Sequence, residues 1–201
     1  PLKEAIADFY GVKAENVFVG NGSDDVLALA FQSFFNGEKP IAFPDITYSF
    51  YPVWCNLFGI EYTNPALDEN FRINPDDYRA ENSGVVIPNP NAPTSIGEGT
   101  EFVEKILEYN GDCVVIIDEA YCDFGGTTSV PLTKKYENLL ITGTFSKSRS
   151  LAGIRIGFAI GSKTLIDTLE AVKNSYNSYT IDSLSIAMGV EAMNDTEYFY
   201  K

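Results

Sequence analysis

Short apolar runs alternate with longer segments of helical periodicity along the 201-residue chain. Short apolar runs bounded by glycine, proline or polar residues are typical of buried strands. These runs predict strands over residues 17–19, 40–43, 60–63, 85–87, 113–117 and 139–142. The run at 113–117, CVVII, contains no charged residue, which is typical of the centre of a parallel sheet.

Around these runs, apolar residues recur at the three- and four-residue spacing of amphipathic helices. The spacing predicts helices over residues 2–10, 23–34, 46–58, 100–109, 164–172 and 181–193. Gly11 would end the first helix, and Ser23 or Asp24 would cap the second. The alternation of strands and helices indicates one α/β domain over residues 1–201, with a mostly parallel central sheet flanked by helices.

Composition adds that 45% of the residues are hydrophobic, enough for a large core. The chain has no run of about 18 apolar residues that would predict a membrane helix. Its first residues lack the features of a secretory signal or a transit peptide, so we expect a cytoplasmic protein. The chain opens without methionine, inside a helical pattern, and we therefore expect it to be part of a longer protein.

The net charge, the absence of histidine and the spacing of the cysteines limit the partners and the reactions that are possible. A formal net charge of −14 repels nucleic acids and anionic membranes, so we expect neither as a partner. The absence of histidine removes Ser-His and Cys-His nucleophiles, and leaves proton transfer to lysine, tyrosine or carboxylates. Cys55, Cys113 and Cys122 are unclustered, so we expect core residues and no metal site.

The apolar run at 139–142 leads into a loop rich in serine and glycine that carries Thr144, Ser146, Lys147 and Arg155. A lysine at the end of a buried strand can lose its proton and attack a carbonyl group. An arginine nearby can bind a phosphate through two parallel hydrogen bonds. A single lysine in a loop is more often solvated than catalytic. A catalytic role for Lys147 therefore depends on other residues of the chain that would lie near it.

Two other predicted strands also end in polar residues. Asp118 and Tyr121 follow the strand at 113–117, at the edge where open α/β sheets bind ligands. A buried Asp118 would need a cationic or hydrogen-bonding partner. The strand at 85–87 leads into PNPNAPTS, a proline-rich loop that can include a cis peptide and hold the Asn91 amide still, or serve only as a structural turn.

The segment GNGSDD, residues 20–25, lies between a predicted strand and a predicted helix. Backbone amides and the helix dipole at such a junction form an anion site, although a plain capped turn would have the same sequence. Tyr48 begins an aromatic segment and is placed to present a flat face to a planar ligand.

Together, these motifs resemble the pyridoxal-phosphate aminotransferases of fold type I, and among them the histidinol-phosphate aminotransferases. The resemblance rests on residues 20–24, 89–94, 118–121 and 144–147, with Arg155 and Gly157, in the family's order and spacing. It implies the large, cofactor-binding domain of the family. We expect the chain to lack the family's amino-terminal arm and its small domain, which carries the arginine that binds the amino donor's carboxylate.

The resemblance implies a role for each site residue. Lys147 would hold pyridoxal phosphate as a Schiff base and then move a proton as base and acid, while Asp118 would pair with the pyridinium nitrogen. Tyr121 and Asn91 would hydrogen-bond the 3′-oxygen, and Tyr48 would stack on the ring. The phosphate would bind the amides of Gly22, Ser23 and Asp24 and the side chains of Thr144, Ser146 and Arg155.

One motif departs from the family pattern. Relatives commonly have Asn-Pro-Thr-Gly where this chain has Ala92-Pro93-Thr94-Ser95, so the amide would come from Asn91, one position earlier.

The activity implied by the resemblance is amino transfer between histidinol phosphate and 2-oxoglutarate in histidine biosynthesis, by a homodimer. The partners would be an amino donor and a 2-oxo acid. One alternative is another fold type I reaction, such as decarboxylation of a phosphorylated amino acid or a lyase reaction; another is a non-catalytic domain for cofactor binding or assembly. We expect the isolated chain to bind the cofactor poorly and not to transaminate.

Overall fold

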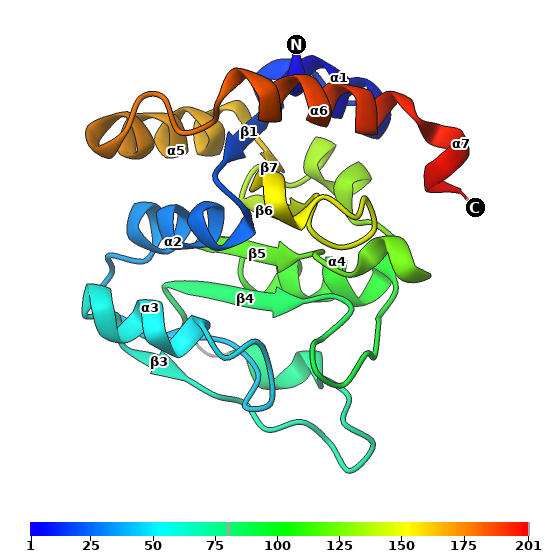
Figure 1. Cartoon of the computed structure of the whole chain (residues 1–201). Helices are drawn as coiled ribbons and strands as arrows, with labels where there is room; N and C mark the ends of the chain where they lie inside the picture. The colour runs from blue at the N-terminus through cyan, green and yellow to red at the C-terminus, as the bar shows by residue number, and fades with distance from the viewer. Residues whose placement is uncertain (80, 201) are drawn as a thin grey trace.

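A seven-stranded sheet with strand order β1-β7-β6-β5-β4-β2-β3 forms the centre of the computed structural model, which describes residues 1–79 and 81–200 (Figure 1). Position 201 of the predicted domain lies outside the described residues. The strands are β1 (Val17–Gly20), β2 (Ile41–Ala42), β3 (Tyr62–Thr63), β4 (Gly84–Pro88), β5 (Val114–Asp118), β6 (Leu139–Thr144) and β7 (Gly157–Gly161).

All of these strands except β7 run in the same direction. Strands β2 to β6 pair in parallel, whereas β7 is antiparallel to both of its neighbours, β1 and β6. The predicted mostly parallel sheet is therefore confirmed, and β5 lies near its centre, between β4 and β6. The sequence pattern does not predict β7, because glycine at both of its ends weakens the signal of a strand.

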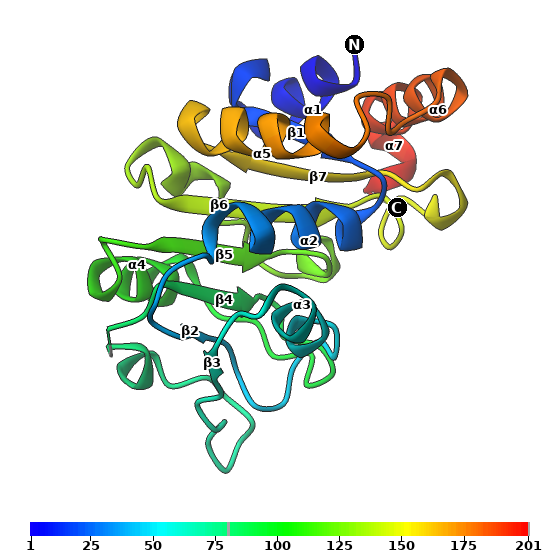
Figure 2. The ribbon, with the colours of Figure 1, turned by 90° about the vertical axis from the view of Figure 1, so that its left-hand side faces the viewer.

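Helices cover both faces of the sheet (Figure 2). Helices α2, α3 and α5 pack on one face, and α1, α4 and α6 pack on the other. The helices are α1 (Leu2–Tyr10), α2 (Ser23–Phe34), α3 (Tyr51–Phe58), α4 (Thr100–Tyr109), α5 (Lys163–Tyr176), α6 (Ser183–Asn194) and α7 (Thr196–Phe199). Short 3-10 helices span Ala14–Asn16, Pro75–Tyr78, Cys122–Phe124, Val130–Lys134 and Ala152–Ile154.

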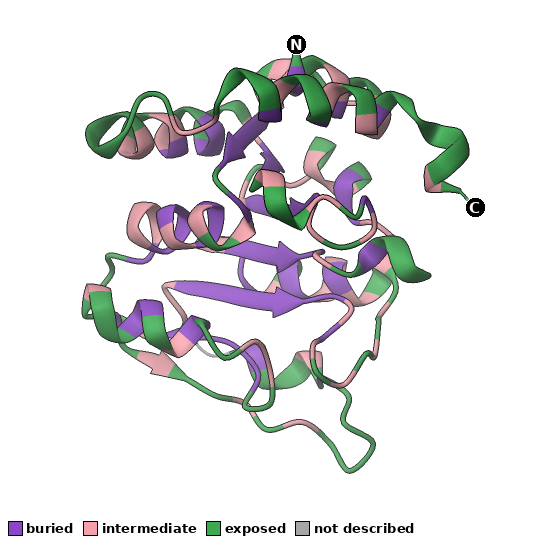
Figure 3. Cartoon of the chain, viewed as in Figure 1, coloured by how far each residue is buried: buried purple, intermediate pink, exposed green. Residues whose placement is uncertain are grey.

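The central strands are buried on both faces, as their near-continuous apolar sequences require (Figure 3). Alternate residues contribute to two separate cores, because successive side chains of a strand point to opposite faces. In β5, Ile116 packs with α2, α3 and α5, whereas Val115 and Ile117 pack with α1 and α4. The two cores fix β5 from both sides and hold its carboxyl end in place.

Two local predictions are corrected by the structure. The predicted helix at 46–58 begins only at Tyr51, with Pro52 in its first turn, where proline is favoured. The backbone at Ile46 is bound to Asp45 and not to a helical turn: the Asp45 carboxylate accepts hydrogen bonds from the backbone amides of Ile46 (2.8 Å) and Leu67 (3.0 Å). Neither Ser23 nor Asp24 caps α2: Gly22 occupies the N-cap position, without a side-chain cap.

The three cysteines are free thiols, with Cys55 and Cys122 buried and Cys113 half-buried. Within residues 1–79 and 81–200, no helix has the length and apolar character needed to cross a membrane. The same residues contain no cluster of histidine, cysteine, aspartate and glutamate suited to a metal ion.

Candidate functional site

A cavity of about 260 Å³ lies where the carboxyl ends of β4, β5 and β6 meet the amino-terminal end of α2. Open α/β sheets bind ligands at this edge. Eight of the residues selected from the sequence line this cavity, namely Ser23, Asp24, Tyr48, Asp118, Tyr121, Ser146, Lys147 and Arg155. Segments that are far apart in the sequence are thus brought together at one site.

Three selected residues do not line this cavity. Gly22 lies directly beneath the Arg155 guanidinium, and the buried Thr144 hydroxyl accepts a hydrogen bond from the amide of Ser146 (3.1 Å). The side-chain amide of Asn91 donates to the carbonyl oxygen of Ile46 (2.9 Å). Asn91 lines a neighbouring cavity of about 320 Å³. Ala92 lines the main cavity instead.

Asp118 is buried, with 6% of its surface exposed, at the end of β5. The Tyr51 hydroxyl donates to Oδ2 (2.8 Å), and the Ala120 amide donates to Oδ1 (3.2 Å). Burial raises the pKa of Asp118 above its ordinary range, and the hydrogen bonds from Tyr51 and Ala120 oppose that rise. No ion pair with a cation is formed by this carboxyl group within the described part of the chain.

The arginines differ in what surrounds them. Arg72 and Arg79 form ion pairs with Glu98 (2.7 Å) and Asp76 (2.8 Å). Arg149 is buried, with its guanidinium carbon 4.1 Å from the centre of the Phe199 ring. The Arg155 guanidinium lies at the cavity and donates to the carbonyl oxygen of Ala152 (3.1 Å).

Lys147 shares the cavity with Arg155, and its Nζ lies 5.0 Å from the centre of the Tyr121 ring. Among the described residues, neither Lys147 nor Arg155 forms an ion pair with a carboxylate. In a chain with a net charge of −14, two unpaired cations in one cavity indicate a site for an anionic ligand.

Two glycines allow Arg155 and the start of β7 to approach the start of α2. Gly22 has a φ of 90°, and a Cβ atom added there would lie 2.4 Å from Nη2 of Arg155. A Cβ atom at Gly157 would lie 2.3 Å from the Ser23 amide nitrogen. The first amides of a helix have no partner inside the helix, so this packing places Arg155 beside free backbone donors that favour an anion.

Tyr48 is oriented by α2, because its hydroxyl donates to Oδ1 of Asp24 (2.8 Å). Burial and the Asp24 carboxylate raise the pKa of Tyr48, so its hydroxyl stays protonated at neutral pH. The ring lines the cavity and packs edge-on against Tyr51, with 5.6 Å between the ring centres. A fixed aromatic face is suited to a planar ligand.

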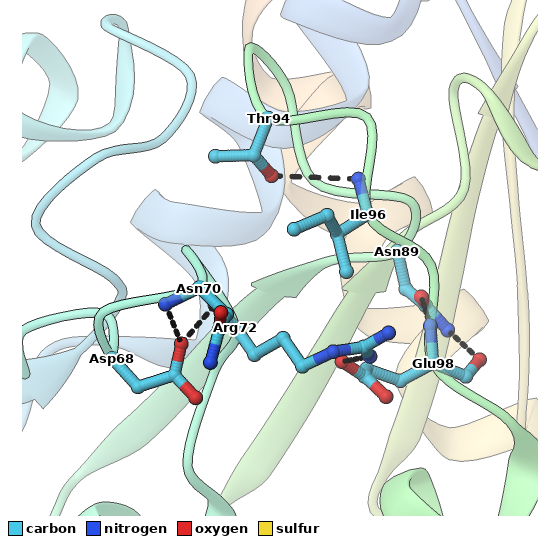
Figure 4. A network of polar contacts seen from close by, with 7 residues as sticks. All are labelled: Asp68, Asn70, Arg72, Asn89, Thr94, Ile96 and Glu98. Atoms are coloured by element: carbon cyan, nitrogen blue, oxygen red, sulfur yellow. Dashed lines mark hydrogen bonds and ion pairs between the residues drawn. The ribbon is translucent and has the colours of Figure 1, made fainter.

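The proline-rich loop after β4 is held by a network of polar contacts (Figure 4). The Asn89 side chain bonds both backbone groups of Glu98: it accepts from the amide (2.7 Å) and donates to the carbonyl (2.9 Å). The Glu98 carboxylate pairs with Arg72, whose own backbone amide donates to Asp68 (2.8 Å). The Asn89–Pro90 and Ala92–Pro93 peptide bonds are cis. The network fixes the wall of the cavity formed by Pro90 and Ala92.

Sequence reasoning missed two buried polar residues that adjoin Asp118: Tyr51, which bonds it, and Glu119, which follows it in the chain. The signal for Tyr51 was available, because a tyrosine inside an aromatic core needs a partner for its hydroxyl. Glu119 is 8% exposed and accepts hydrogen bonds from the Thr128 hydroxyl (2.6 Å) and the Ser129 amide (2.6 Å). It ties the segment after β5 to the next loop.

Glu119 should make stability depend on pH. Burial raises the pKa of Glu119 from 4.5 to about 7, so the unfolded chain releases this proton at a lower pH than the folded protein. Its stabilising contribution is full below pH 4.5 and is lost as the pH rises to about 7, which amounts to about 3 kcal/mol.

Replacement of Glu119 by glutamine should make the free energy of unfolding less dependent on pH across this window. Denaturant unfolding at several pH values measures it, with the exposed Glu108→Gln as control; an unchanged slope in Glu119→Gln would contradict the assignment.

Comparison with known proteins identifies the family of the chain. The family model described as aminotransferase class I and II matches residues 1–200. Histidinol-phosphate aminotransferase 1 of Hydrogenovibrio crunogenus is 54% identical over 198 residues, which are 98% of this chain and 56% of that protein. Histidinol-phosphate aminotransferase of Pseudomonas putida is 52% identical over 98% of this chain and 57% of its own length. The chain thus spans a little over half the length of these relatives.

Solved structures share the architecture. The histidinol-phosphate aminotransferase of Clostridium acetobutylicum has a TM-score of 0.87 at 25% identity, over 99% of this chain and 60% of that one. Aspartate aminotransferase of Thermus thermophilus has a TM-score of 0.90 at 22% identity, over 99% and 56%, and shows the fold alone. The family match over nearly the whole chain confirms the resemblance found in the motifs. This chain belongs to the class I and II aminotransferase family.

Proposed function

We propose that the protein is a pyridoxal-phosphate-dependent aminotransferase that transfers an amino group between histidinol phosphate and 2-oxoglutarate in histidine biosynthesis. Family membership supports the reaction class. Identity of 52–54% to proteins named histidinol-phosphate aminotransferase supports the amino donor. Because the chain spans 56–57% of those proteins, the complete activity is part of the proposal.

The observation that carries the proposal is the arrangement of charge around one cavity. Asp118 is a buried carboxylate without a cationic partner, and Lys147 and Arg155 are cations without a carboxylate, all within the described residues. Pyridoxal phosphate has a ring nitrogen that carries a proton, a phosphate dianion and an aldehyde that reacts with a lysine amine. The donors and acceptors of the cavity therefore fit this cofactor.

The residues at the phosphate end would act as a cup. The amides of Ser23 and Asp24 at the start of α2 would donate hydrogen bonds, and Arg155 would add a charge-assisted pair. The Gly22 amide donates to the carbonyl oxygen of Gly20 (2.9 Å) and would join the cup only after releasing it. Ser146 would contribute its hydroxyl from the cavity wall, whereas Thr144 would orient Ser146 through the bond to its amide.

The remaining residues would bind the ring and move the proton. When bound, the cofactor supplies an electron sink for the negative charge that develops on the substrate's α-carbon. Lys147 would attach the cofactor and, once the substrate's amino group had displaced it, its free amine would take the proton from that α-carbon and deliver it to the C4′ carbon. Asp118 would hold the proton on the ring nitrogen, and Tyr48 would stack on the ring. Tyr121 would donate to the 3′-oxygen. One hydrogen of the Asn91 side-chain amide bonds the Ile46 carbonyl oxygen, and the other would donate to the 3′-oxygen.

Cofactor binding and substrate turnover test the proposal directly. Pyridoxal phosphate added to the protein should give a yellow complex, and borohydride should then fix the cofactor on the peptide that contains Lys147. Histidinol phosphate and 2-oxoglutarate should yield glutamate in the natural full-length protein. Release of carbon dioxide from an added phosphorylated amino acid, with no glutamate formed from histidinol phosphate, would show a decarboxylase instead, and no spectral change would indicate a non-catalytic domain.

A homodimer is a second part of the proposal, supported by an apolar surface. Phe50, Val53 and Leu57 are 45%, 48% and 71% exposed and recur at helical spacing from the N-cap of α3 onward. Such a row is suited to a second copy of the chain. Sedimentation velocity should give a dimer whose dissociation is promoted by Leu57→Glu; a monomer at micromolar concentration would contradict it.

The cytoplasmic location stays a prediction from the sequence.

A further inference from the structure

The Asp118 carboxyl group has a second buried partner that the reaction scheme above does not use. Asp118 Oδ2 accepts the hydrogen of the Tyr51 hydroxyl at 2.8 Å, and both residues are buried. A hydrogen bond that a donor makes to a carboxylate stabilises the charged form, whereas burial favours the neutral acid. The Tyr51 hydroxyl opposes the effect of burial on Asp118, and the Ala120 amide and Thr142 act in the same direction.

Tyr51 has little freedom to point elsewhere. Its ring is 0% exposed and sits in the first turn of α3. The ring centres of Phe31, Phe43, Tyr48 and Trp54 lie 5.6–6.2 Å from the centre of the Tyr51 ring. Such an aromatic cage holds the ring still, and in it the Asp118 carboxylate is the acceptor for the hydroxyl.

We infer that Tyr51 is a positioning residue of the active site, which holds Oδ2 of Asp118 and keeps this carboxyl group ionised and in one orientation. The Ala120 amide holds Oδ1, whose remaining lone pair is left for a ligand in the cavity. The inference rests on the proposed function for its consequence, since the partner of Oδ1 would be the protonated ring nitrogen of the cofactor. The effect of Tyr51 on the Asp118 carboxyl group depends only on residues of this chain.

Other charged and titratable groups also face the Asp118 carboxyl group. Asp24 at the start of α2 raises its pKa, against the hydrogen bonds that lower it. The further groups on the cavity are Tyr48, Tyr121, Lys147 and Arg155. A Tyr51→Phe substitution leaves all of them in place, so a change in the titration of Asp118 reports the loss of one hydroxyl.

The first experiment titrates the Asp118 carboxyl group in the cofactor-free protein, by isotope-edited infrared spectroscopy with Asp118→Asn to assign the band. Tyr51→Phe should move the midpoint to higher pH. Incorporation of 3,5-difluorotyrosine at position 51, a more acidic donor, should move it to lower pH while the cage stays filled. Tyr78→Phe is the matched control, because Tyr78 is also buried, at 1% exposure, and its hydroxyl has no partner among the described residues.

The second experiment measures the affinity for pyridoxal phosphate at constant pH. Tyr51→Phe should weaken binding about tenfold or more, as expected for loss of a hydrogen bond to a charged group. The effect should shrink in the Asp118→Asn background, because the two residues act through one contact. Failure of the natural protein to bind would overturn the proposed function, not the effect of Tyr51 on Asp118. An unchanged midpoint in both position-51 variants would overturn the inference even if the cofactor binds.

Discussion

Replacement of Lys147 by alanine should abolish covalent attachment of pyridoxal phosphate and lower turnover by at least about a thousandfold. Lys147 lies on the cavity beside Tyr121 and Arg155, and among residues 1–79 and 81–200 no other lysine lines it. The variant should still bind the cofactor reversibly, because Arg155 and the amides at the start of α2 remain. Loss of the amine thus separates attachment from binding.

Borohydride reduction followed by peptide mapping measures the attachment, and glutamate formation measures the turnover. Lys147→Arg keeps the positive charge but not the nucleophile, and it should be as inactive as Lys147→Ala. Lys163→Ala is the control, since this exposed lysine pairs with Asp167 on α5. A reduced cofactor found on another lysine, or turnover close to that of the natural protein, would remove Lys147 from its proposed role.

Asp118→Asn should slow the chemical step by about a thousandfold, or about 4 kcal/mol, while the fold keeps its stability. Asparagine keeps the size of the side chain and can still accept the Tyr51 hydrogen bond, but it has no charge to hold the proton on the ring nitrogen. Burial of the carboxylate disfavours its charged form, so its removal should not lower the melting temperature.

Single-turnover kinetics and thermal unfolding of the same preparation test both halves of this expectation. Asp24→Asn gives the comparison, because Asp24 lines the same cavity and its amide could still accept from Tyr48. Asp24→Asn should lose far less activity than Asp118→Asn. Equal losses in the two variants, or a low melting temperature for Asp118→Asn alone, would mean that Asp118 acts through the structure and not through its charge.

The alternation of strands and helices was predictable because it depends on local periodicity, and it gave the sheet and the two covering layers. The residues at the carboxyl ends of β5 and β6 were predictable for a related reason: parallel strands end at one edge, so Asp118, Ser146 and Lys147 had to lie near each other. The start of α3 was not predictable, because it depends on Asp45 and its long-range partner Leu67.

The side-chain partners at the site required the tertiary structure. Asn91 donates to the carbonyl of Ile46, which is 45 positions away, and no local pattern predicts that contact. The contact between Tyr51 and Asp118 spans 67 positions. Motifs therefore identified which residues gather at the cavity better than which atoms they offer to it.

The pairing of β1 with β7 has a consequence for the order in which the protein acquires its structure. Val17 is aligned with Ile160, so β1 has to wait for about 140 further residues before its sheet neighbour is synthesised. β7 is the neighbour of β1 in the sheet, and contacts of such high sequence separation form slowly. The pairing of β1 with β7 brings together the start of α2, which follows β1, and Arg155, which precedes β7. On the ribosome, the anion-binding end of the cavity would therefore assemble only after the strand that carries Asp118 has emerged.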